Sequence, residues 1–158
     1  MPEELQKPKI LIIDDAITNI KVLGSTLQAE YKILFSLNAQ EGINNAIANK
    51  PDLILLDILM PEMDGYEACR RLKADERTKD IPVIFITSRT GEEDEAKGFE
   101  AGGVDYIAKP FSPVVTKARI KTHLELKKRT DFLEWMLREK SSEMQAMEKE
   151  YAKLFLRQ

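Results

Sequence analysis

Residues 53–65 of the chain read LILLDILMPEMDG. The first five residues form a continuous apolar run that is too short for a helix and that ends in the carboxylate of Asp57. Such a run is typical of a strand that is buried on both faces of a parallel sheet. A helical pattern follows from Gly65 to Ala74, so this stretch predicts one strand-to-helix unit of an α/β fold.

The same alternation of short apolar strands and amphipathic helices extends on both sides of this unit. We expect the strands at Lys9–Asp14, Lys32–Leu37, Leu53–Asp57, Val83–Thr87 and Val104–Ala108. We expect the helices at Ile17–Glu30, Ala39–Asn49, Gly65–Ala74, Glu92–Ala101 and from Pro113 onward, the last with Ser112 as its N-cap. Five strands alternating with five helices predict a doubly wound parallel sheet that helices cover on both faces.

The composition argues against several classes of protein. The 158 residues carry a net charge of −3 and are 43% hydrophobic and 32% charged, which indicates a soluble globular protein. No apolar run approaches the roughly 20 residues that a membrane-spanning helix needs, and the acidic residues 1–5 do not resemble a signal peptide. With one cysteine, Cys69, and one histidine, His123, the chain has no disulfide framework, and we predict a cytoplasmic location.

Ionisable side chains follow most of the predicted strands at the point where each strand ends. The carboxyl ends of parallel strands meet at one edge of the sheet, which is where ligands bind in such folds. The side chains expected there are those of Asp14, Asp15, Asp57, Thr87 and Lys109. Three carboxylates at close quarters repel one another, and a hard divalent cation with oxygen ligands relieves that repulsion. The sequence therefore predicts a Mg²⁺ site.

A carboxylate at this edge can also act as a nucleophile and form an aspartyl phosphate. Phosphoryl transfer needs mainly positioning and neutralisation of charge. Asp57 lies on the central strand and is the candidate nucleophile, while Lys109 would neutralise a phosphoryl oxygen and the Thr87 hydroxyl would donate a hydrogen bond to another.

Four motifs carry a resemblance to a known family. They are IIDD at 12–15, DILMPEMDG at 57–65, TS at 87–88 and DYIAKPF at 105–111. Together they show that residues 9–126 resemble the receiver domain of two-component response regulators. The resemblance implies a flavodoxin-like sheet with strand order 2-1-3-4-5.

The resemblance also implies roles for individual residues. Asp57 would accept a phosphoryl group from a sensor histidine kinase, with Thr87 and Lys109 contacting the phosphoryl oxygens. The implied Mg²⁺ ligands are Asp14, Asp15, Asp57 and the backbone carbonyl of Leu59.

Two further features are implied by the same resemblance. The peptide bond between Lys109 and Pro110 is expected to be cis. Tyr106 matches an aromatic switch position, where the ring turns inward when Thr87 moves toward the phosphoryl group. This movement would alter the face formed by the fourth helix, the fifth strand and the fifth helix.

The last part of the chain differs in character from the rest. Residues 113–158 contain no glycine or proline and carry a net charge of +4, against −7 for residues 1–112. As one helix they would reach about 69 Å. A 3-4 spacing of seven apolar residues in nine positions predicts a coiled-coil seam, with Lys140 as its flaw. The seam positions are Leu126, Thr130, Leu133, Leu137, Lys140, Met144, Met147, Tyr151 and Leu154.

We therefore expect a parallel homodimer through this helix, with packing back onto the domain or fraying as the alternatives. The basic cluster Lys127–Arg129 is interpreted as a solvated face rather than a nucleic-acid site, because acids alternate with bases through the helix. His123 is interpreted as structural or solvent-facing.

The expected organisation is an N-terminal tail at 1–8, a receiver domain at 9–126 and a helical linker at 127–158. The linker would lead to an output domain outside this sequence, such as a cyclic-dinucleotide enzyme, and the chain itself would not be an enzyme. One alternative is a stand-alone phosphorelay or dimerising scaffold protein. A remote alternative is a phosphohydrolase of the haloacid dehalogenase type, but that family needs a second aspartate at the position of Leu59.

Overall fold

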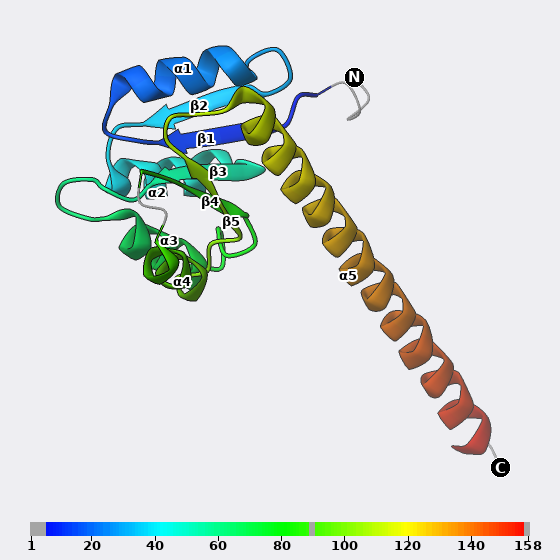
Figure 1. Cartoon of the computed structure of the whole chain (residues 1–158). Coiled ribbons are helices and arrows are strands. Elements are labelled where there is room, and N and C mark those ends of the chain that lie inside the picture. The colour runs from blue at the N-terminus through cyan, green and yellow to red at the C-terminus, as the bar shows by residue number, and fades with distance from the viewer. Residues whose placement is uncertain (1–5, 89–90, 157–158) are drawn as a thin grey trace. The chain divides into compact units, whose positions relative to one another are not determined.

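The computed structural model describes residues 6–88 and 91–156 and places five parallel strands in one sheet (Figure 1). The strand order is β2-β1-β3-β4-β5, which confirms the predicted topology. The strands are β1 (Lys9–Ile13), β2 (Lys32–Ser36), β3 (Leu53–Asp57), β4 (Val83–Thr87) and β5 (Asp105–Ala108). Because β3 is the central strand, its carboxyl end lies between those of β1 and β4.

Five helices connect and follow these strands. They are α1 (Ile17–Leu27), α2 (Ala39–Asn49), α3 (Gly65–Ala74), α4 (Glu92–Glu100) and α5 (Pro113–Leu156). The predicted end of α1 at Glu30 is wrong, because the chain turns after Leu27 to enter β2. Tyr31, which suggested a longer helix, is buried beyond that turn and its backbone N–H donates to the Leu27 carbonyl at 3.0 Å.

The side chains of each inner strand alternate between the two faces of the sheet. In β3, Leu53 and Leu55 pack in the core under α1 and the first turns of α5, whereas Ile54 and Leu56 pack in the core under α2 and α3. All four side chains are fully buried. A strand that is covered on both faces needs a continuous apolar sequence, which explains the run that opens at Leu53.

Helix α5 begins as the sequence predicts. The Ser112 hydroxyl oxygen accepts a hydrogen bond from the Val115 backbone N–H at 3.3 Å. The described chain divides into two compact units between Leu124 and Glu125. In the first unit Thr116 and Ile120 are buried, while the described side chains of the second unit are exposed, except that of Lys127, which is partly covered. Within the described ranges, no helix combines the length and apolar character needed to cross a membrane.

Candidate functional site

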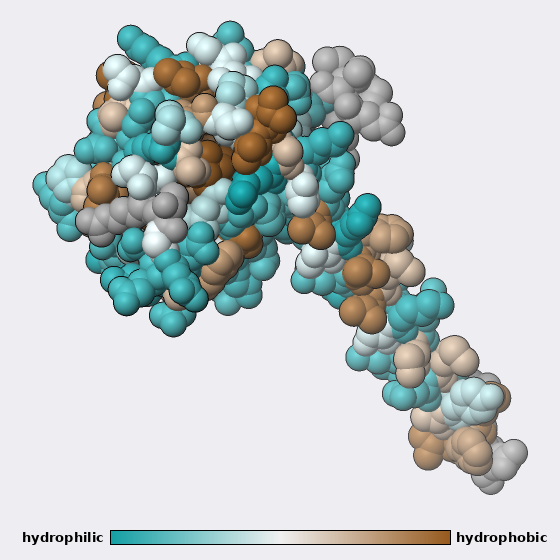
Figure 2. Space-filling view, viewed as in Figure 1, coloured by the Kyte–Doolittle hydropathy of each residue, from teal (hydrophilic) through white to brown (hydrophobic). Residues whose placement is uncertain are grey.

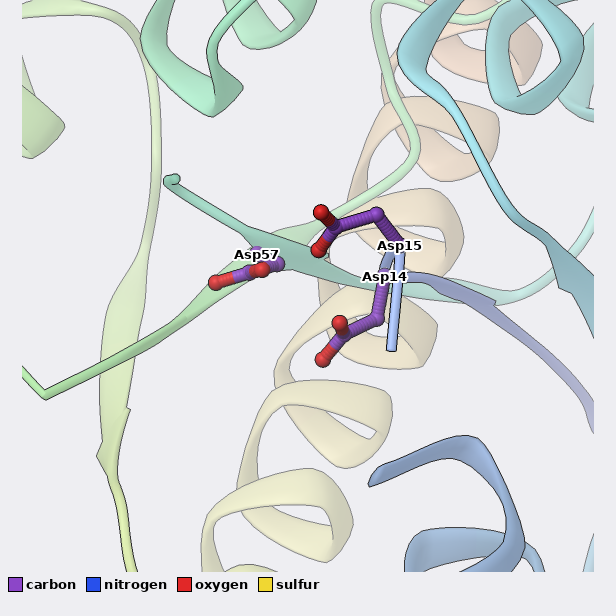
Figure 3. A group of neighbouring side chains, drawn as sticks. All are labelled: Asp14, Asp15 and Asp57. Atoms are coloured by element: carbon purple, nitrogen blue, oxygen red, sulfur yellow. The ribbon is translucent and has the colours of Figure 1, made fainter. Parts of the chain in front are cut away.

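Three carboxylates gather at the carboxyl edge of the sheet (Figure 3). Asp14 and Asp15 directly follow β1, and Asp57 is the last residue of β3. One oxygen atom from each side chain lies within 4.8 Å of the other two. The parallel pairing of β1 with β3 brings these residues together, because it places the two strand ends side by side.

The Asp14 carboxylate is held by local donors. Its Oδ1 atom accepts a hydrogen bond from the Ala16 backbone N–H at 2.9 Å, and its Oδ2 atom accepts one from the Asn19 side-chain amide at 3.1 Å. Asp14 is fully buried, whereas Asp15 beside it is exposed. Because both Asp14 oxygens already accept hydrogen bonds, this carboxylate is fixed in orientation.

Asp57 is buried and faces a cation. Its Oδ1 atom accepts a hydrogen bond from the Lys109 ammonium at 3.2 Å, and the same ammonium lies 3.6 Å from Asp14 Oδ2. Burial raises the pKa of the Asp57 carboxyl to about 6, and the negative charge of Asp14 adds to that rise while Lys109 opposes it. One ammonium does not balance three carboxylates, so the site retains an excess of negative charge.

The loop between β3 and α3 is packed tightly against the backbone of Asp57. The Gly65 N–H donates to the Ile58 carbonyl at 2.8 Å, and a Cβ atom at position 65 would lie 2.3 Å from the Asp57 carbonyl oxygen. Asp64 caps α3 by accepting a hydrogen bond from the Glu67 N–H at 2.9 Å. Leu59 lies in this loop with its side chain half exposed.

Thr87 and Tyr106 line a common pocket of about 330 Å³. Asp105 and Arg119 line the same pocket. Thr87 is buried at the end of β4, and its carbonyl accepts a hydrogen bond from the Lys109 N–H at 2.9 Å. The peptide bond between Lys109 and Pro110 is cis.

Tyr106 is held against α4. Its hydroxyl lies 2.7 Å from the carbonyl oxygens of both Asp94 and Glu95. Its ring packs between Phe85 and Phe99, with centroid separations of 5.7 and 5.6 Å. Burial raises the pKa of the Tyr106 hydroxyl to about 12, so it stays protonated and donates to α4.

The donor set of the acidic cluster fits a hard divalent cation. Three carboxylates with mutually close oxygens offer the ligand type that Mg²⁺ prefers. Burial is the main cause of the raised pKa of Asp57, and repulsion from the Asp14 carboxylate adds to it while the Lys109 ammonium opposes it. The cluster therefore has both the ligand atoms and the excess charge that a divalent cation requires.

One polar cluster was not predicted from the sequence. The Asp105 carboxylate binds Arg119 through Oδ1 and lies 2.9 Å from His123 Nε2 through Oδ2. His123 is therefore paired and mostly buried. The spacing of Arg119 and His123 by four residues places them on one face of a helix, but it does not reveal which strand residue they meet.

The family model described as "Response regulator receiver domain" matches residues 10–121 of the chain. Over 131 residues the chain is 41% identical to a probable cyclic di-GMP phosphodiesterase of Vibrio cholerae, with 83% of the chain and 30% of that protein covered. Over 115 residues it is 38% identical to the response regulator PleD of Caulobacter vibrioides, with 72% and 25% covered. The chain thus spans less than a third of the length of these two relatives.

A solved structure with a similar fold contains a bound metal ion. The receiver domain of the sensor histidine kinase PA1611 of Pseudomonas aeruginosa has a magnesium ion coordinated in its active site cleft. It matches 75% of this chain and 98% of its own, with a TM-score of 0.70 and 27% sequence identity.

Proposed function

The chain belongs to the response regulator receiver domain family, and we propose that it accepts a phosphoryl group on Asp57 from a partner sensor histidine kinase. The observation that carries this proposal is the position of Asp57. It is a buried carboxylate at the end of the central strand, 3.2 Å from the Lys109 ammonium and close to two further carboxylates. Asp14 is fixed by its own hydrogen bonds and Asp15 is exposed, so Asp57 is the carboxylate best placed to react.

In the proposed step, a carboxylate oxygen of Asp57 forms a bond to phosphorus. The bond between phosphorus and the donor's imidazole nitrogen breaks, and its electron pair stays on that nitrogen. The Lys109 ammonium neutralises negative charge on the phosphoryl oxygens, and the Thr87 hydroxyl donates a hydrogen bond to one of them. The chain is an acceptor in this step and needs no catalytic turnover of its own.

We propose that Asp14, Asp15, Asp57 and the Leu59 carbonyl hold Mg²⁺. When bound, this cation supplies positive charge that neutralises the carboxylates and the incoming phosphoryl group. The excess negative charge of the cluster supports the proposal, and so does the magnesium ion in the PA1611 receiver domain.

The raised pKa of Asp57 predicts how the metal-free protein responds to pH. The native carboxyl has a pKa near 6 and the unfolded one near 3.8, so the native state gains stability as the pH falls through 6. Asp57→Asn should therefore stabilise the metal-free protein by about 1–3 kcal/mol at about pH 7.5. The advantage should shrink as the pH falls to about 5, and urea denaturation in the presence of a chelator measures it.

Two controls separate this effect from general changes of charge. Asp80→Asn removes an exposed carboxylate and should change stability by less than about 0.5 kcal/mol at either pH. Added Mg²⁺ should stabilise the unsubstituted protein, because it binds the folded state, and should stabilise Asp57→Asn much less. If Asp57→Asn is less stable than the parent at about pH 7.5 without metal, the predicted effect of the raised Asp57 pKa is contradicted.

We propose that residues 9–126 form the receiver and residues 127–158 a linker to an output domain. The chain shares 41% sequence identity over 131 residues with a longer, probable cyclic di-GMP phosphodiesterase, and this similarity supports an output domain of the cyclic-dinucleotide class. A stand-alone phosphorelay or scaffold protein remains the alternative proposal. The buried, unpaired thiol of Cys69 supports a reducing, cytoplasmic setting.

We also propose that two copies of the chain pair in parallel through the seam of α5. Figure 2 shows apolar side chains on the surface of this helix, and Leu133 and Leu137 are 58% and 70% exposed. A single long helix with an uncovered apolar stripe is marginal in water. Arg129 and Glu134 flank the seam and carry opposite charges. In a parallel pair in register, Arg129 of one copy can therefore form a salt bridge with Glu134 of the other.

The seam gives a prediction with a matched control. Leu133→Ser removes a seam leucine from both copies and should weaken dimerisation at least about tenfold in sedimentation equilibrium. Leu156→Ser makes the same change at an exposed leucine outside the seam, which is 87% exposed against 58% for Leu133, and should leave the dimer constant unchanged. A parent chain that stays monomeric at micromolar concentration, with and without a phosphoryl mimic, would exclude the proposed dimer.

A further inference from the structure

A polar cluster joins β5 to α5. The Asp105 carboxylate accepts a hydrogen bond from Arg119 Nη1 through Oδ1, and its Oδ2 lies 2.9 Å from His123 Nε2. The same Arg119 nitrogen also donates to the Tyr106 carbonyl oxygen at 2.8 Å. Two consecutive residues of β5 are thus bonded to one face of α5.

The cluster is partly sheltered from water, which strengthens it. The side chains of Asp105 and His123 are 24% and 15% exposed, and that of Arg119 is 42% exposed. Bonds that involve a charged partner are shorter and stronger than neutral ones, and they gain further strength where water is limited. Arg119 and His123 are four residues apart, so the Asp105 carboxylate bridges one full turn of the helix.

The apolar contact beneath this cluster cannot fix the helix in the same way. Ile107 of β5 and Ile120 of α5 lie in the same buried core. Apolar burial is itself non-directional, so it restrains the helix through close packing and not through bonds of fixed direction. The three bonds from Asp105 and Tyr106 are directional, so they set the rotation and height of α5 against β5.

The other end of β5 leads to the acidic site. Lys109, directly after β5, binds Asp57 at 3.2 Å, and the Tyr106 hydroxyl binds the first turn of α4. Thr87, Tyr106, Asp105 and Arg119 line one pocket, so a movement of Thr87 or Tyr106 takes place beside the Asp105 cluster.

We propose that Asp105 is a positioning residue that makes α5 follow β5 when Asp57 is phosphorylated. Lys109 and Tyr106 move with the phosphoryl group, and the Asp105 carboxylate passes that movement to Arg119 and His123. Arg119 and His123 belong to the same helix, α5 (Pro113–Leu156), that carries the seam residues. The inference rests on the proposed phosphorylation of Asp57.

The test compares Asp105→Asn with Glu100→Gln in the full chain. Asparagine keeps the shape of the side chain but removes its charge and one acceptor oxygen. Glu100 is an exposed acid at the end of α4 and is not part of the Asp105 cluster, so its substitution is a matched loss of one negative charge. Amide hydrogen exchange of residues 113–124 is measured with Mg²⁺ alone and with Mg²⁺ plus beryllofluoride. Phosphoryl uptake from acetyl phosphate is measured in parallel by intact mass.

We expect the parent and Glu100→Gln to show a change in α5 exchange on adding beryllofluoride. Asp105→Asn should accept the phosphoryl group as the parent does but lose that change, so that its exchange ratio between the two conditions falls to about one. A purely structural role would raise exchange equally in both conditions and leave the ratio unaltered, which would overturn the inference.

Arg119→Gln provides a second variant in case Asp105→Asn unfolds, and it should lose the same response. The inference would also be overturned if the parent takes up the phosphoryl group but its α5 amide exchange does not change on adding beryllofluoride. If the parent takes up no phosphoryl group at all, the proposed function fails first, and the mass measurement identifies that case.

Discussion

Asp57→Asn is expected to abolish the uptake of a phosphoryl group from acetyl phosphate in the presence of Mg²⁺. The amide has no ionised oxygen to attack phosphorus, and the remaining carboxylates of the cluster are poorly placed to replace it. Asp14 has both oxygens in hydrogen bonds with Ala16 and Asn19, and Asp15 is exposed to water. The measurement is the intact mass of the protein, which should rise by one phosphoryl group in the parent and stay unchanged in the variant.

The matched control is Asp80→Asn, which replaces an exposed aspartate outside the cluster. This variant should gain the phosphoryl group at the parent's rate. The two substitutions make the same chemical change, so a difference between them reports the position of the carboxylate rather than the loss of charge. A mass gain of one phosphoryl group on Asp57→Asn would refute the assignment of this residue.

Gly65→Ala is expected to have the largest effect on stability among the glycine substitutions considered. The added Cβ atom would lie 2.3 Å from the Asp57 carbonyl oxygen and 2.8 Å from the Ile58 Cα atom. Both are backbone atoms, so neither can yield by a change of rotamer. Overpacking of this kind costs about 1–3 kcal/mol, and here relief requires the β3–α3 loop to move away from the reacting residue.

Gly24→Ala provides the contrast. Gly24 lies inside α1, and a Cβ atom there meets no other atom within 4 Å. This substitution should stabilise the protein by about 0.5–1 kcal/mol, because alanine is the better helix former. The midpoint of urea denaturation measures both variants, and phosphoryl uptake by Gly65→Ala should slow by about tenfold or more. A Gly65→Ala variant as stable as the parent would show that the loop is not tightly packed.

Much of the fold could be predicted because its strands are buried on both faces. The runs at β3 and β4 are continuous and apolar, so their bounds match the predicted ones. The end of α1 was mispredicted because Tyr31 keeps the helical spacing although the chain has already turned. Periodicity reports which residues are buried, but it does not distinguish a helix from the turn that follows it.

The acidic cluster could be predicted for a similar reason, since parallel strands bring their carboxyl ends to one edge. The partners of Tyr106 and Asp105 could not. The Tyr106 hydroxyl bonds to two carbonyl groups of α4, and the Asp105 carboxylate meets Arg119 and His123 of α5. Each contact depends on how a helix is rotated against the sheet, and the sequence pattern does not determine that rotation.

The most direct test of the central claim locates the phosphoryl group itself. The parent chain is incubated with acetyl phosphate and Mg²⁺ and then treated with borohydride, which reduces an acyl phosphate to an alcohol and releases phosphate. Peptide mass spectrometry of the product should find homoserine at position 57. Homoserine at Asp14 or Asp15 instead, or a phosphoryl group retained on His123, would contradict the account.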